Sequence, residues 1–335
     1  MDLPVALDAM GGDRAPDAMV EGAVRAYRAG VPVMLVGDEE RLHMALRTYE
    51  VELPVVHAPD VIGMDERAVE VRRRKRASIA VAADEVASGR ASALVSMGHS
   101  GATMAAALFR LGRLKGVERP AIVAHVPART GFVTLLDVGA NADCRPAMLQ
   151  QFAVMGSVYA RVVFGHADPA VGLMSIGEEA SKGNELVRAT HPLLASTPGI
   201  RFHGNVEGND LFSGAVPVIV TDGFTGNVML KLAEGEAKML FASMRDELRA
   251  SLRGRLGGWL ARPALRAVAD KVDPASYGAQ PLLGVGAPAF IGHGSSGARA
   301  VHSALRFAHD TATRSLVRRM AAELEGQRSD DDGDD

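Results

Sequence analysis

The amino-acid sequence predicts an α/β protein built on a mixed, mostly parallel β-sheet. Short apolar runs alternate with stretches of helical periodicity along most of the chain, which is the pattern of strands joined by crossover helices. Polar, glycine-rich loops follow most of these runs, as loops do at the carboxyl ends of parallel strands. One pair of runs, 121–126 and 133–137, is separated by too few residues for a crossover helix. We therefore expect those two strands to be antiparallel neighbours and the sheet to be mixed.

The strands and the domain organisation follow from the apolar runs. The runs expected to form strands are residues 5–8, 31–36, 54–57, 93–96, 121–126, 133–137, 171–176, 216–221 and 289–291. Helices are expected in most gaps, including one from 303 to 325. Without an internal repeat or a Pro- or Ser-rich linker, residues 1–326 are expected to form a single unit or two intertwined lobes. The formal net charge is -3, and the aspartate-rich residues 327–335 are expected to form a disordered acidic tail.

Length and composition indicate a globular protein. The chain has 335 residues, of which 47% are hydrophobic, so it can bury a large core. It contains no apolar run long enough to span a bilayer and does not begin with a basic and then apolar leader, so we expect a cytoplasmic protein. The single cysteine, Cys144, excludes a disulfide framework and a cysteine-based zinc site. We expect no metal, no cofactor and no nucleic-acid partner.

One arginine-rich segment, 245–271, does not have the pattern of a core helix. Its Leu252, Leu256, Trp259 and Leu260 fall on one helical face, with arginines on the rest. One interpretation is a protruding helical pair that packs on a partner subunit. The other is an interfacial helix whose apolar face contacts an anionic membrane, and both can hold at once.

The glycine-rich loops point to an anionic ligand. Glycine lets the backbone approach a ligand, and free amides at a helix N-terminus favour an anion. The loop 292–297, GHGSSG, matches the dinucleotide fingerprint, but that fingerprint requires a second strand after the following helix. The chain also lacks a P-loop motif. A bare phosphate or a phosphate-bearing substrate is the ligand that remains.

Several side chains in these loops are candidates for chemistry. His99 and His293 each lie inside a glycine-rich loop and are candidates for acid/base work or binding. Lys182 and Lys231 are cations suited to a phosphate. Cys144 lies just ahead of a helix, and we favour a structural role at a crowded turn over a reactive thiol. No nucleophile-elbow motif is present.

Five motifs, taken together, resemble those of a known family. They are LDAMGGDRAP, LLDVGANADCRP, MSIGEEASKGNEL, GNVEGNDLFSG and VTDGFTGNVMLKLAEG, in order along the chain. This series resembles that of the bacterial phosphate acyltransferases of phospholipid synthesis. The resemblance implies a three-layer α/β/α fold similar to that of isocitrate dehydrogenase and phosphotransacetylase. It also implies a homodimer, peripherally associated with the membrane, that converts acyl-acyl-carrier protein and inorganic phosphate into acyl phosphate and free carrier protein.

The sequence departs from the family pattern at a few positions. His99 and Ser100 stand where we expect asparagine and threonine, so we treat His99 as a binding residue. Arg14 stands where histidine is common. Asn209 stands where arginine is usual, which removes one expected anion contact.

The implied reaction, attack of a phosphate oxygen on a thioester, assigns roles to the loop residues. Residues expected to take part in catalysis are Lys182, Asn184, Asp222, Asn227 and Lys231. Residues expected to bind phosphate or substrate are Asp8, Gly11, Gly12, Asp13, His99, Ser100, Gly101, Asn141, Asn205, Glu207, Gly223, Thr225, Gly226 and His293.

Within these sets, the amides of HSGAT and GFTGN are expected to hold phosphate together with the two lysines. Asparagines 141, 205 and 227 are expected to donate to the phosphate or to the oxyanion, with Asp222 and Glu207 orienting them. Asp8 and Asp13 are expected to fix neighbouring loops by accepting amide hydrogens.

The basic run VRRRKR, 71–76, has two interpretations. It is either a solvated helix face or a docking patch for the acidic carrier protein, in which Arg73 and Lys75 take part. Two alternative functions also remain open: a phosphotransacetylase-like enzyme acting on acyl-coenzyme A, and a non-catalytic membrane-bound scaffold for lipid synthesis.

Overall fold

A single 11-stranded sheet runs through the protein in the order β3-β2-β1-β4-β11-β10-β5-β6-β9-β7-β8. The computed structural model describes residues 2–331, apart from the side chains of 274 and 327–331. The strands are β1 (Val5–Asp8), β2 (Val33–Gly37), β3 (Val55–His57), β4 (Ala93–Ser96), β5 (Ala121–Pro127), β6 (Phe132–Leu136), β7 (Ala170–Met174), β8 (Arg201–Val206), β9 (Val218–Val220), β10 (Ala279–Leu283) and β11 (Ala289–Gly292).

Helices occupy most of the connections between the strands. The α-helices are α1 (Asp17–Arg28), α2 (Glu39–Arg47), α3 (Ser78–Ala87), α4 (Ser100–Ala106), α5 (Pro146–Phe164), α6 (Glu185–Ser196), α7 (Gly223–Ala250), α8 (Leu252–Val272), α9 (Ala298–Thr313) and α10 (Leu316–Asp331). Short 3-10 helices are η1 (Ala68–Arg72), η3 (Asp210–Phe212) and η4 (Pro274–Ser276), and η2 (Ala107–Leu111) is a π-helix.

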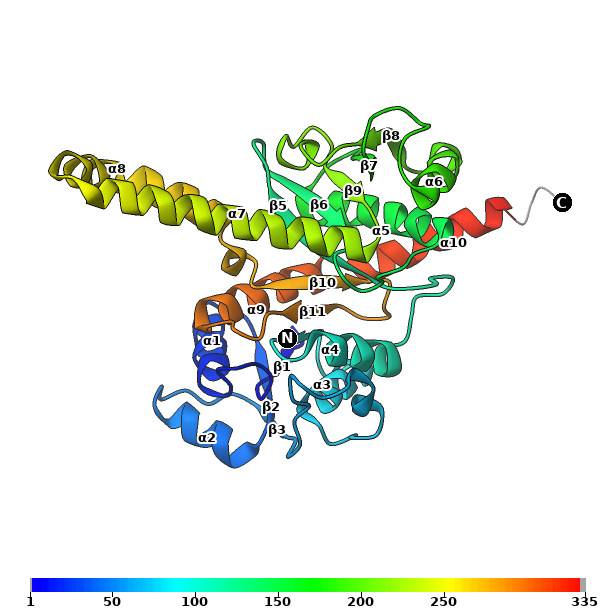
Figure 1. The fold of residues 1–335 in the computed structure, drawn as a ribbon. Coiled ribbons are helices and arrows are strands. Elements are labelled where there is room, and N and C mark those ends of the chain that lie inside the picture. The colour runs from blue at the N-terminus through cyan, green and yellow to red at the C-terminus, as the bar shows by residue number, and fades with distance from the viewer. Residues whose placement is uncertain (1, 332–335) are drawn as a thin grey trace.

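The sheet consists of two parallel blocks joined by antiparallel strands. In the first block β3, β2, β1, β4 and β11 are parallel, and in the second β6, β9, β7 and β8 are parallel. Strands β10 and β5 connect the blocks by antiparallel pairing. The predicted antiparallel pair is β5 and β6, so the expectation of a mixed, mostly parallel sheet is confirmed (Figure 1).

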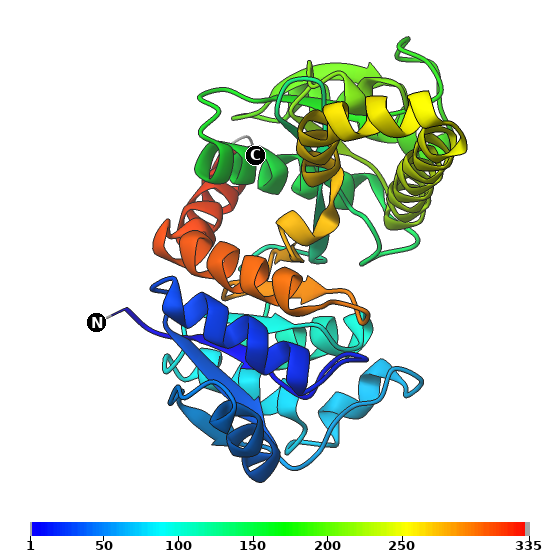
Figure 2. The same ribbon diagram turned by 90° about the vertical axis from the view of Figure 1, so that its left-hand side faces the viewer.

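Helices cover both faces of the sheet, which gives the three-layer arrangement. In β1, Val5 and Leu7 pack into one core with Met19 of α1 and Val301 of α9, whereas Ala6 packs into a second core with α3. Figure 2 shows α1 and α9 side by side on the first of these faces. The second block is covered in the same way by α5 on one face and the start of α7 on the other.

Two strands and one helix break differ from the expectations. Strand β8 (RFHGNV) was not expected, because it has no continuous apolar run. It lies at the edge of the sheet, where several of its side chains are exposed or half-exposed. Strand β10 (AQPLL) contains Pro281, which in sequence indicates a break. The helix expected from 303 to 325 is divided at Ser315, whose φ is 58°. The expected acidic tail is helical as far as Asp331, and residues 332–335 lie outside the described residues.

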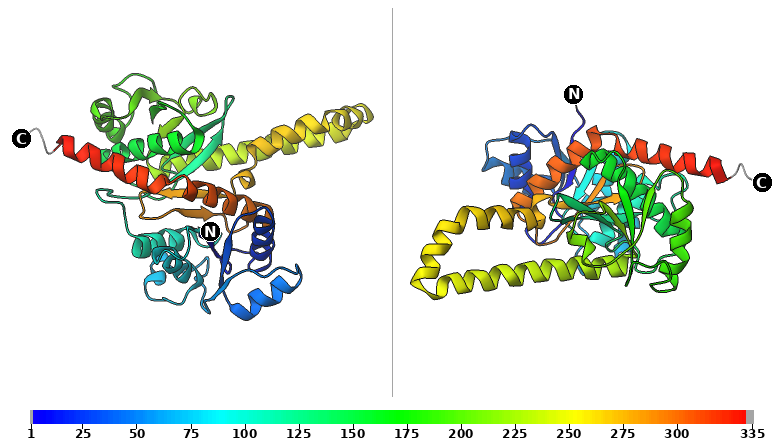
Figure 3. Two further views of the ribbon diagram at one scale, coloured as in Figure 1. Left: turned by 180° about the vertical axis from the view of Figure 1, so that it is seen from behind. Right: turned by 90° about the horizontal axis from the view of Figure 1, so that it is seen from above.

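Helices α7 and α8 form an antiparallel hairpin that projects from the body of the protein, as Figures 1 and 3 show. The segment 245–271 lies in this hairpin. Ser251 separates the two helices and caps α8 by accepting a hydrogen bond from Gly254 N at 2.9 Å. Leu252 and Trp259, near the tip, are 83% and 68% exposed. Within residues 2–331, no helix is both long and apolar enough to cross a bilayer.

A partly buried aromatic cluster centred on His125 of β5 connects the two blocks. His125 Nε2 lies 2.6 Å from the Tyr159 hydroxyl oxygen, and the imidazole also contacts the rings of Tyr277 and Phe307. These partners come from α5, from the segment before β10 and from α9. Burial lowers the pKa of His125 from 6.5 to about 3.

This burial predicts acid sensitivity. Between pH 6.5 and about 3 the unfolded chain binds a proton at His125 that the folded protein does not, so stability falls as pH decreases. The loss attributable to this residue reaches roughly 4 kcal/mol at the low end of that range. Urea unfolding at pH 7, 6 and 5 should show a shallower decline for His125→Gln than for wild type. Equal slopes would contradict this account.

Candidate active site

Asp8, at the carboxyl end of β1, organises the loops of the first block. Its Oδ2 accepts a hydrogen bond from Ser96 Oγ at 2.7 Å, and its Oδ1 accepts one from Met10 N at 3.4 Å. Burial raises the pKa of this carboxyl. A Cβ at Gly11 would lie 2.6 Å from Asp8 Oδ2 and 3.0 Å from Gly98, so the loops after β1 and β4 meet only because this residue is glycine. The neighbouring strand β4 is bound to Asp8 through the Ser96 hydroxyl rather than through a backbone amide, so the expected contact of Asp8 with the amides of neighbouring loops stays a prediction.

The loop after β11 packs against the loop after β1. Asp13 N donates to Gly294 O at 2.8 Å, so the contact is made by the backbone of Asp13. Gly12 has a φ of +102°, and a Cβ there would lie 3.2 Å from Gly294 O. His293 is exposed, and its Nδ1 is 2.9 Å from Ser295 Oγ in the same loop. These residues therefore share one edge of the sheet with Asp8.

His99 is the N-cap of α4. Its Nδ1 accepts a hydrogen bond from Ala102 N at 3.1 Å, and its carbonyl oxygen accepts one from Thr103 N at 2.9 Å. Two of the HSGAT amides, those of Ala102 and Thr103, are therefore already paired, and phosphate binding by the amides of Ser100 and Gly101 stays a prediction. Acceptance at Nδ1 leaves the ring proton on Nε2. Ser100 and Gly101 follow as the first residues of the helix.

In the second block, Asp137 is a buried carboxylate at a strand end, as Asp8 is in the first block. The sequence did not single out Asp137 as a site residue. Its Oδ1 accepts hydrogen bonds from the backbone amides of Ile122, Gly139 and Ala140 at 3.0, 3.2 and 3.0 Å. Its Oδ2 accepts from Asn141 N at 2.7 Å and Asn141 Nδ2 at 3.0 Å. Asp137 is fully buried, and burial raises its pKa. It ties the loop after β6 to strand β5.

The expected role of Asn141 as a donor to substrate is not supported by its contacts. Its Nδ2 donates to Pro120 O at 2.8 Å as well as to Asp137 Oδ2. Both side-chain N–H bonds are thus used within the protein. Asp137, rather than Asp222 or Glu207, orients this side chain.

The start of α7 is capped by Asp222, and most of its amides are paired. Asp222 Oδ1 accepts from Thr225 N, and Oδ2 accepts from Thr225 Oγ1, each at 2.8 Å. Gly223 N donates to Asn141 O at 2.8 Å, and Gly226 N donates to Asp222 O at 2.9 Å. The amides of Gly223, Thr225 and Gly226 are therefore not available to phosphate, because a carboxylate and two carbonyl oxygens already accept from them.

The glycines at this helix start allow close packing on the Asp137 loop. A Cβ at Gly226 would lie 1.9 Å from Asp137 O, and one at Gly223 would lie 2.5 Å from Asn141 O. A Cβ at Gly139 would be 3.9 Å from Asn227. Across residues 2–331, the Asn227 side chain has no hydrogen-bond partner, so its amide is available to a ligand.

Cys144 is not a nucleophile in this environment. Burial, together with the nearby carboxylates of Asp137, Asp222 and Asp143, raises its pKa to about 12. A thiol with this pKa is protonated at neutral pH. The interpretation of Cys144 as a structural residue agrees with this environment.

The loop between β7 and α6 carries Lys182. Asn205 Nδ2 donates to Glu179 O at 2.8 Å and so anchors the loop to β8. Lys182 is exposed, and within the described part of the chain it forms no ion pair. Asn184 is the N-cap of α6 and accepts from Val187 N at 2.9 Å, so its contacts indicate a structural role.

Two further predicted residues are engaged within the protein. Lys231 Nζ lies 2.9 Å from Glu234 Oε2, so its charge is partly neutralised. Glu207 N donates to Asp210 Oδ2 at 2.8 Å, which places Glu207 in a turn after β8. Of the two lysines, Lys182 is therefore the better candidate for an anion.

The structure thus gathers the predicted residues at the carboxyl ends of the strands in each block. The first block holds Asp8, Gly11, Gly12, Asp13, His99, Ser100, Gly101 and His293. The second holds Asn141, Lys182, Asn184, Asn205, Glu207, Asp222, Gly223, Thr225, Gly226, Asn227 and Lys231. The first block offers a histidine and closely packed glycine loops, and the second offers Lys182, which has no ion pair within the described residues, and the unpaired side-chain amide of Asn227.

The fold of this chain is similar to that of two solved phosphotransacetylases. A phosphotransacetylase from Streptococcus pyogenes superposes with a TM-score of 0.64 at 17% identity, covering 95% of this chain and 94% of that one. EutD phosphotransacetylase from Staphylococcus aureus superposes with a TM-score of 0.61 at 16% identity, covering 93% and 94%. The expected similarity to phosphotransacetylase in fold is confirmed, and that to isocitrate dehydrogenase remains a prediction.

The sequence assigns the family. Residues 3–319 match the family described as "Fatty acid synthesis protein", and the chain belongs to it. A protein named phosphate acyltransferase from Thermus thermophilus is 55% identical over 320 residues, covering 96% of this chain and 98% of the relative. Another of that name from Geobacter sulfurreducens is 48% identical over 326 residues, covering 96% and 94%.

Proposed function

We propose that this protein is an acyltransferase that moves a fatty acyl group from acyl-acyl-carrier protein to inorganic phosphate. The observation that carries the proposal is its 55% identity, over 96% of its length, to a phosphate acyltransferase. The phosphotransacetylase-like fold supports the same type of chemistry. The product, acyl phosphate, would serve phospholipid synthesis.

In the proposed reaction a phosphate oxygen attacks the thioester carbonyl, and a tetrahedral oxyanion forms. Its collapse breaks the carbon–sulfur bond, leaves the acyl carbon bonded to the phosphate oxygen and releases the carrier thiolate. Phosphate is already nucleophilic at neutral pH, so no covalent acyl-enzyme is needed. The enzyme's task is to hold two anionic reactants together and to stabilise the oxyanion.

We assign the phosphate contact to Lys182 and a donor role to the side chain of Asn227. Lys182 has no competing carboxylate partner among residues 2–331, unlike Lys231. Asn227 keeps its amide free, whereas that of Asn141 is committed to Asp137 and Pro120. Asp137 and Asp222 position the backbone around Asn227, and Asn205 anchors the loop that carries Lys182.

The carrier protein rather than coenzyme A is the proposed acyl donor. Comparing kcat/KM for the same acyl chain on the two thioesters, at fixed phosphate, tests this choice. A clear preference for the carrier thioester is expected. Equal or better use of acyl-coenzyme A would support the phosphotransacetylase-like alternative instead.

We further propose that the α7–α8 hairpin mediates dimerisation and membrane contact. A groove of about 900 Å³ lies between the two helices and is lined by apolar side chains such as Phe241 and Leu265 and by several arginines. A second copy of the chain would cover such a surface. The exposed leucines and Trp259 near the tip would enter the headgroup region of an anionic membrane. The protein would then be cytoplasmic and bound peripherally to the membrane surface.

Replacing Leu252, Leu256, Trp259 and Leu260 together by serine is expected to abolish sedimentation with anionic vesicles, because these side chains supply the apolar contact. Turnover of soluble substrate should stay within about twofold. Met44→Ser on α2, where the side chain is 69% exposed, is the matched control. Sedimentation of the quadruple variant equal to wild type would exclude membrane contact at the tip.

A further inference from the structure

One exposed surface combines basic and apolar side chains beside the first-block loops. It consists of Met64, Val69, Arg72, Arg73, Lys75 and Phe109, and we refer to it as the η1 surface. Met64, Val69 and Phe109 are 50%, 52% and 51% exposed, although all three are large hydrophobic residues. Clusters of exposed apolar residues bordered by charge are typical of interaction sites.

The geometry of η1 explains why these side chains face outward. In a 3-10 helix, residues three apart share a face. Ala68 and Val71 face inward: a Cβ at Gly101 would be 3.0 Å from Ala68 Cβ, and Val71 is only 1% exposed. Val69 and Arg72 lie on the adjoining, outward face.

Phe109 belongs to the π-helix η2, and Arg72 connects it to η1. The Arg72 guanidinium carbon lies 5.8 Å from the centre of the Phe109 ring. This cation–π contact holds the arginine over the ring and leaves its N–H groups to meet a partner. Arginine and large aromatic side chains are the residues that contribute most to protein–protein binding.

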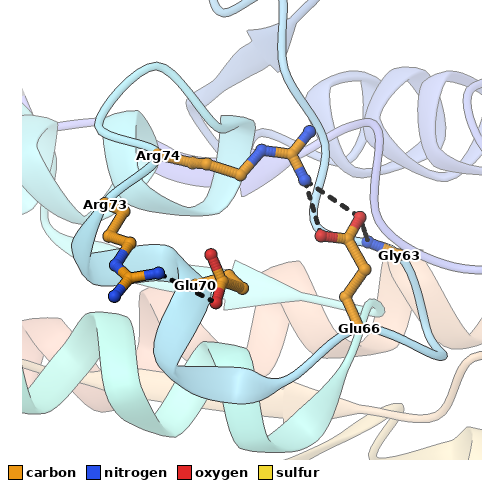
Figure 4. A network of polar contacts seen from close by, with 5 residues as sticks. All are labelled: Gly63, Glu66, Glu70, Arg73 and Arg74. Carbon is orange, nitrogen blue, oxygen red and sulfur yellow. Dashed lines mark hydrogen bonds and ion pairs between the residues drawn. The ribbon is translucent and has the colours of Figure 1, made fainter.

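Internal ion pairs determine which charges of the basic run are available. Arg74 Nη1 makes two hydrogen bonds to Glu66, at 2.9 and 2.7 Å, and Glu66 also accepts from Gly63 N (Figure 4). Arg73 is 82% exposed and reaches Glu70 only at 3.9 Å (Figure 4). Arg74 is thus committed to Glu66, whereas Arg72, Arg73 and Lys75 are exposed, as Arg76 also is, and Arg72 contacts the Phe109 ring directly.

The η1 surface packs directly against the first-block loops of the candidate active site. Ala68 packs against Gly101, at the start of the helix that His99 caps. A Cβ at Gly294 would lie 3.0 Å from Met64 Cε, which places Met64 against the loop after β11. A protein bound here would hold a substrate arm at the edge of the sheet where Asp8 and His99 lie.

We infer that the η1 surface docks an acidic, amphipathic helix of the acyl-bearing carrier protein, with Phe109 as the apolar anchor and Arg72, Arg73 and Lys75 as its basic border. Its charge requires a partner helix that carries carboxylates, and its exposed apolar centre requires an apolar residue between them. The inference rests on the proposed function for the identity of the acyl donor, the carrier protein. It adds the η1 surface as the site that selects this donor.

Kinetics with two donors test the docking site separately from the chemistry. Phe109→Ser is expected to raise KM about tenfold or more for acyl-carrier protein, with kcat unchanged, because the anchor is lost. An acyl-pantetheine thioester, which has no carrier protein, should be used equally well by the variant and wild type. Tyr27→Ser on α1, where the ring is 47% exposed, is the matched control and should change neither value. Equal losses with both donors, or no change with either, would overturn the inference.

Direct binding separates this inference from the proposed function. Fluorescence anisotropy of labelled carrier protein should show weaker binding by Arg73→Glu/Lys75→Glu and a smaller salt dependence, with Arg47→Glu on α2 as the charge control. Unchanged affinity of the double variant would exclude the η1 surface. Specific binding without any acyl transfer by wild type would contradict the proposed function and leave the docking site standing.

Discussion

Replacing Lys182 by alanine is expected to lower kcat/KM for acyl phosphate formation by about 100-fold, because removal of one preorganised charge stabilising the reacting anions costs about 3 kcal/mol of barrier. The structure supports this choice through contacts: Lys182 is exposed and free of ion pairs within residues 2–331, in a loop that Asn205 anchors at Glu179. Initial rates over a range of phosphate concentrations measure the effect.

The dependence on phosphate distinguishes this role from a general loss of structure. Lys182→Arg should restore part of the activity, and Lys115→Ala, an exposed lysine on another loop, should leave it unchanged. A Lys182→Ala enzyme with wild-type kcat/KM would remove this lysine from the phosphate site.

Replacing Asp137 by asparagine is expected to lower the free energy of unfolding by about 3 kcal/mol and activity at least tenfold. The carboxylate accepts hydrogen bonds from the amides of Ile122, Gly139, Ala140 and Asn141 and from the Asn141 side chain. An asparagine amide nitrogen would face two of these donors and accept from neither, and hydrogen bonds to a charged group contribute about 1.5–3 kcal/mol each.

Urea unfolding at pH 7 measures this loss, and the neighbouring Asp143→Asn serves as its control. Asp143 is exposed on the same loop, so its variant should change stability by less than about 0.5 kcal/mol. A stable Asp137→Asn protein would show that the loop after β6 is held by other contacts.

The strands that line the site were predictable because their residues are buried on both faces. Strands β1 and β4 are buried over their whole length and apolar up to their last residues, Asp8 and Ser96, so the strand ends and the polar loops that follow are visible in sequence. Strand β8 was missed because an edge strand needs no continuous apolar run. Strand β10 was missed because Pro281 indicates a break, although antiparallel neighbours hold it in the sheet.

The glycines and aspartates of the site were predictable, but their partners were not. Asp137 ends an apolar run and is followed two residues later by Gly139, and Asp8 likewise ends an apolar run and is followed three residues later by Gly11. This shared pattern could have identified Asp137 as a residue that organises a loop. Which donor each carboxylate meets depends on how the loops fold together. The amides at the start of α7 therefore looked free in sequence, whereas Asp222 and the carbonyl of Asn141 satisfy them.

The most direct test of the account is acyl phosphate formation by the purified protein from palmitoyl-carrier protein, with and without inorganic phosphate. The account predicts that carrier thiol is released and acyl phosphate accumulates in equal amounts, and only when phosphate is present. Folded protein that yields no phosphate-dependent product would contradict the enzymatic role and favour the scaffold alternative.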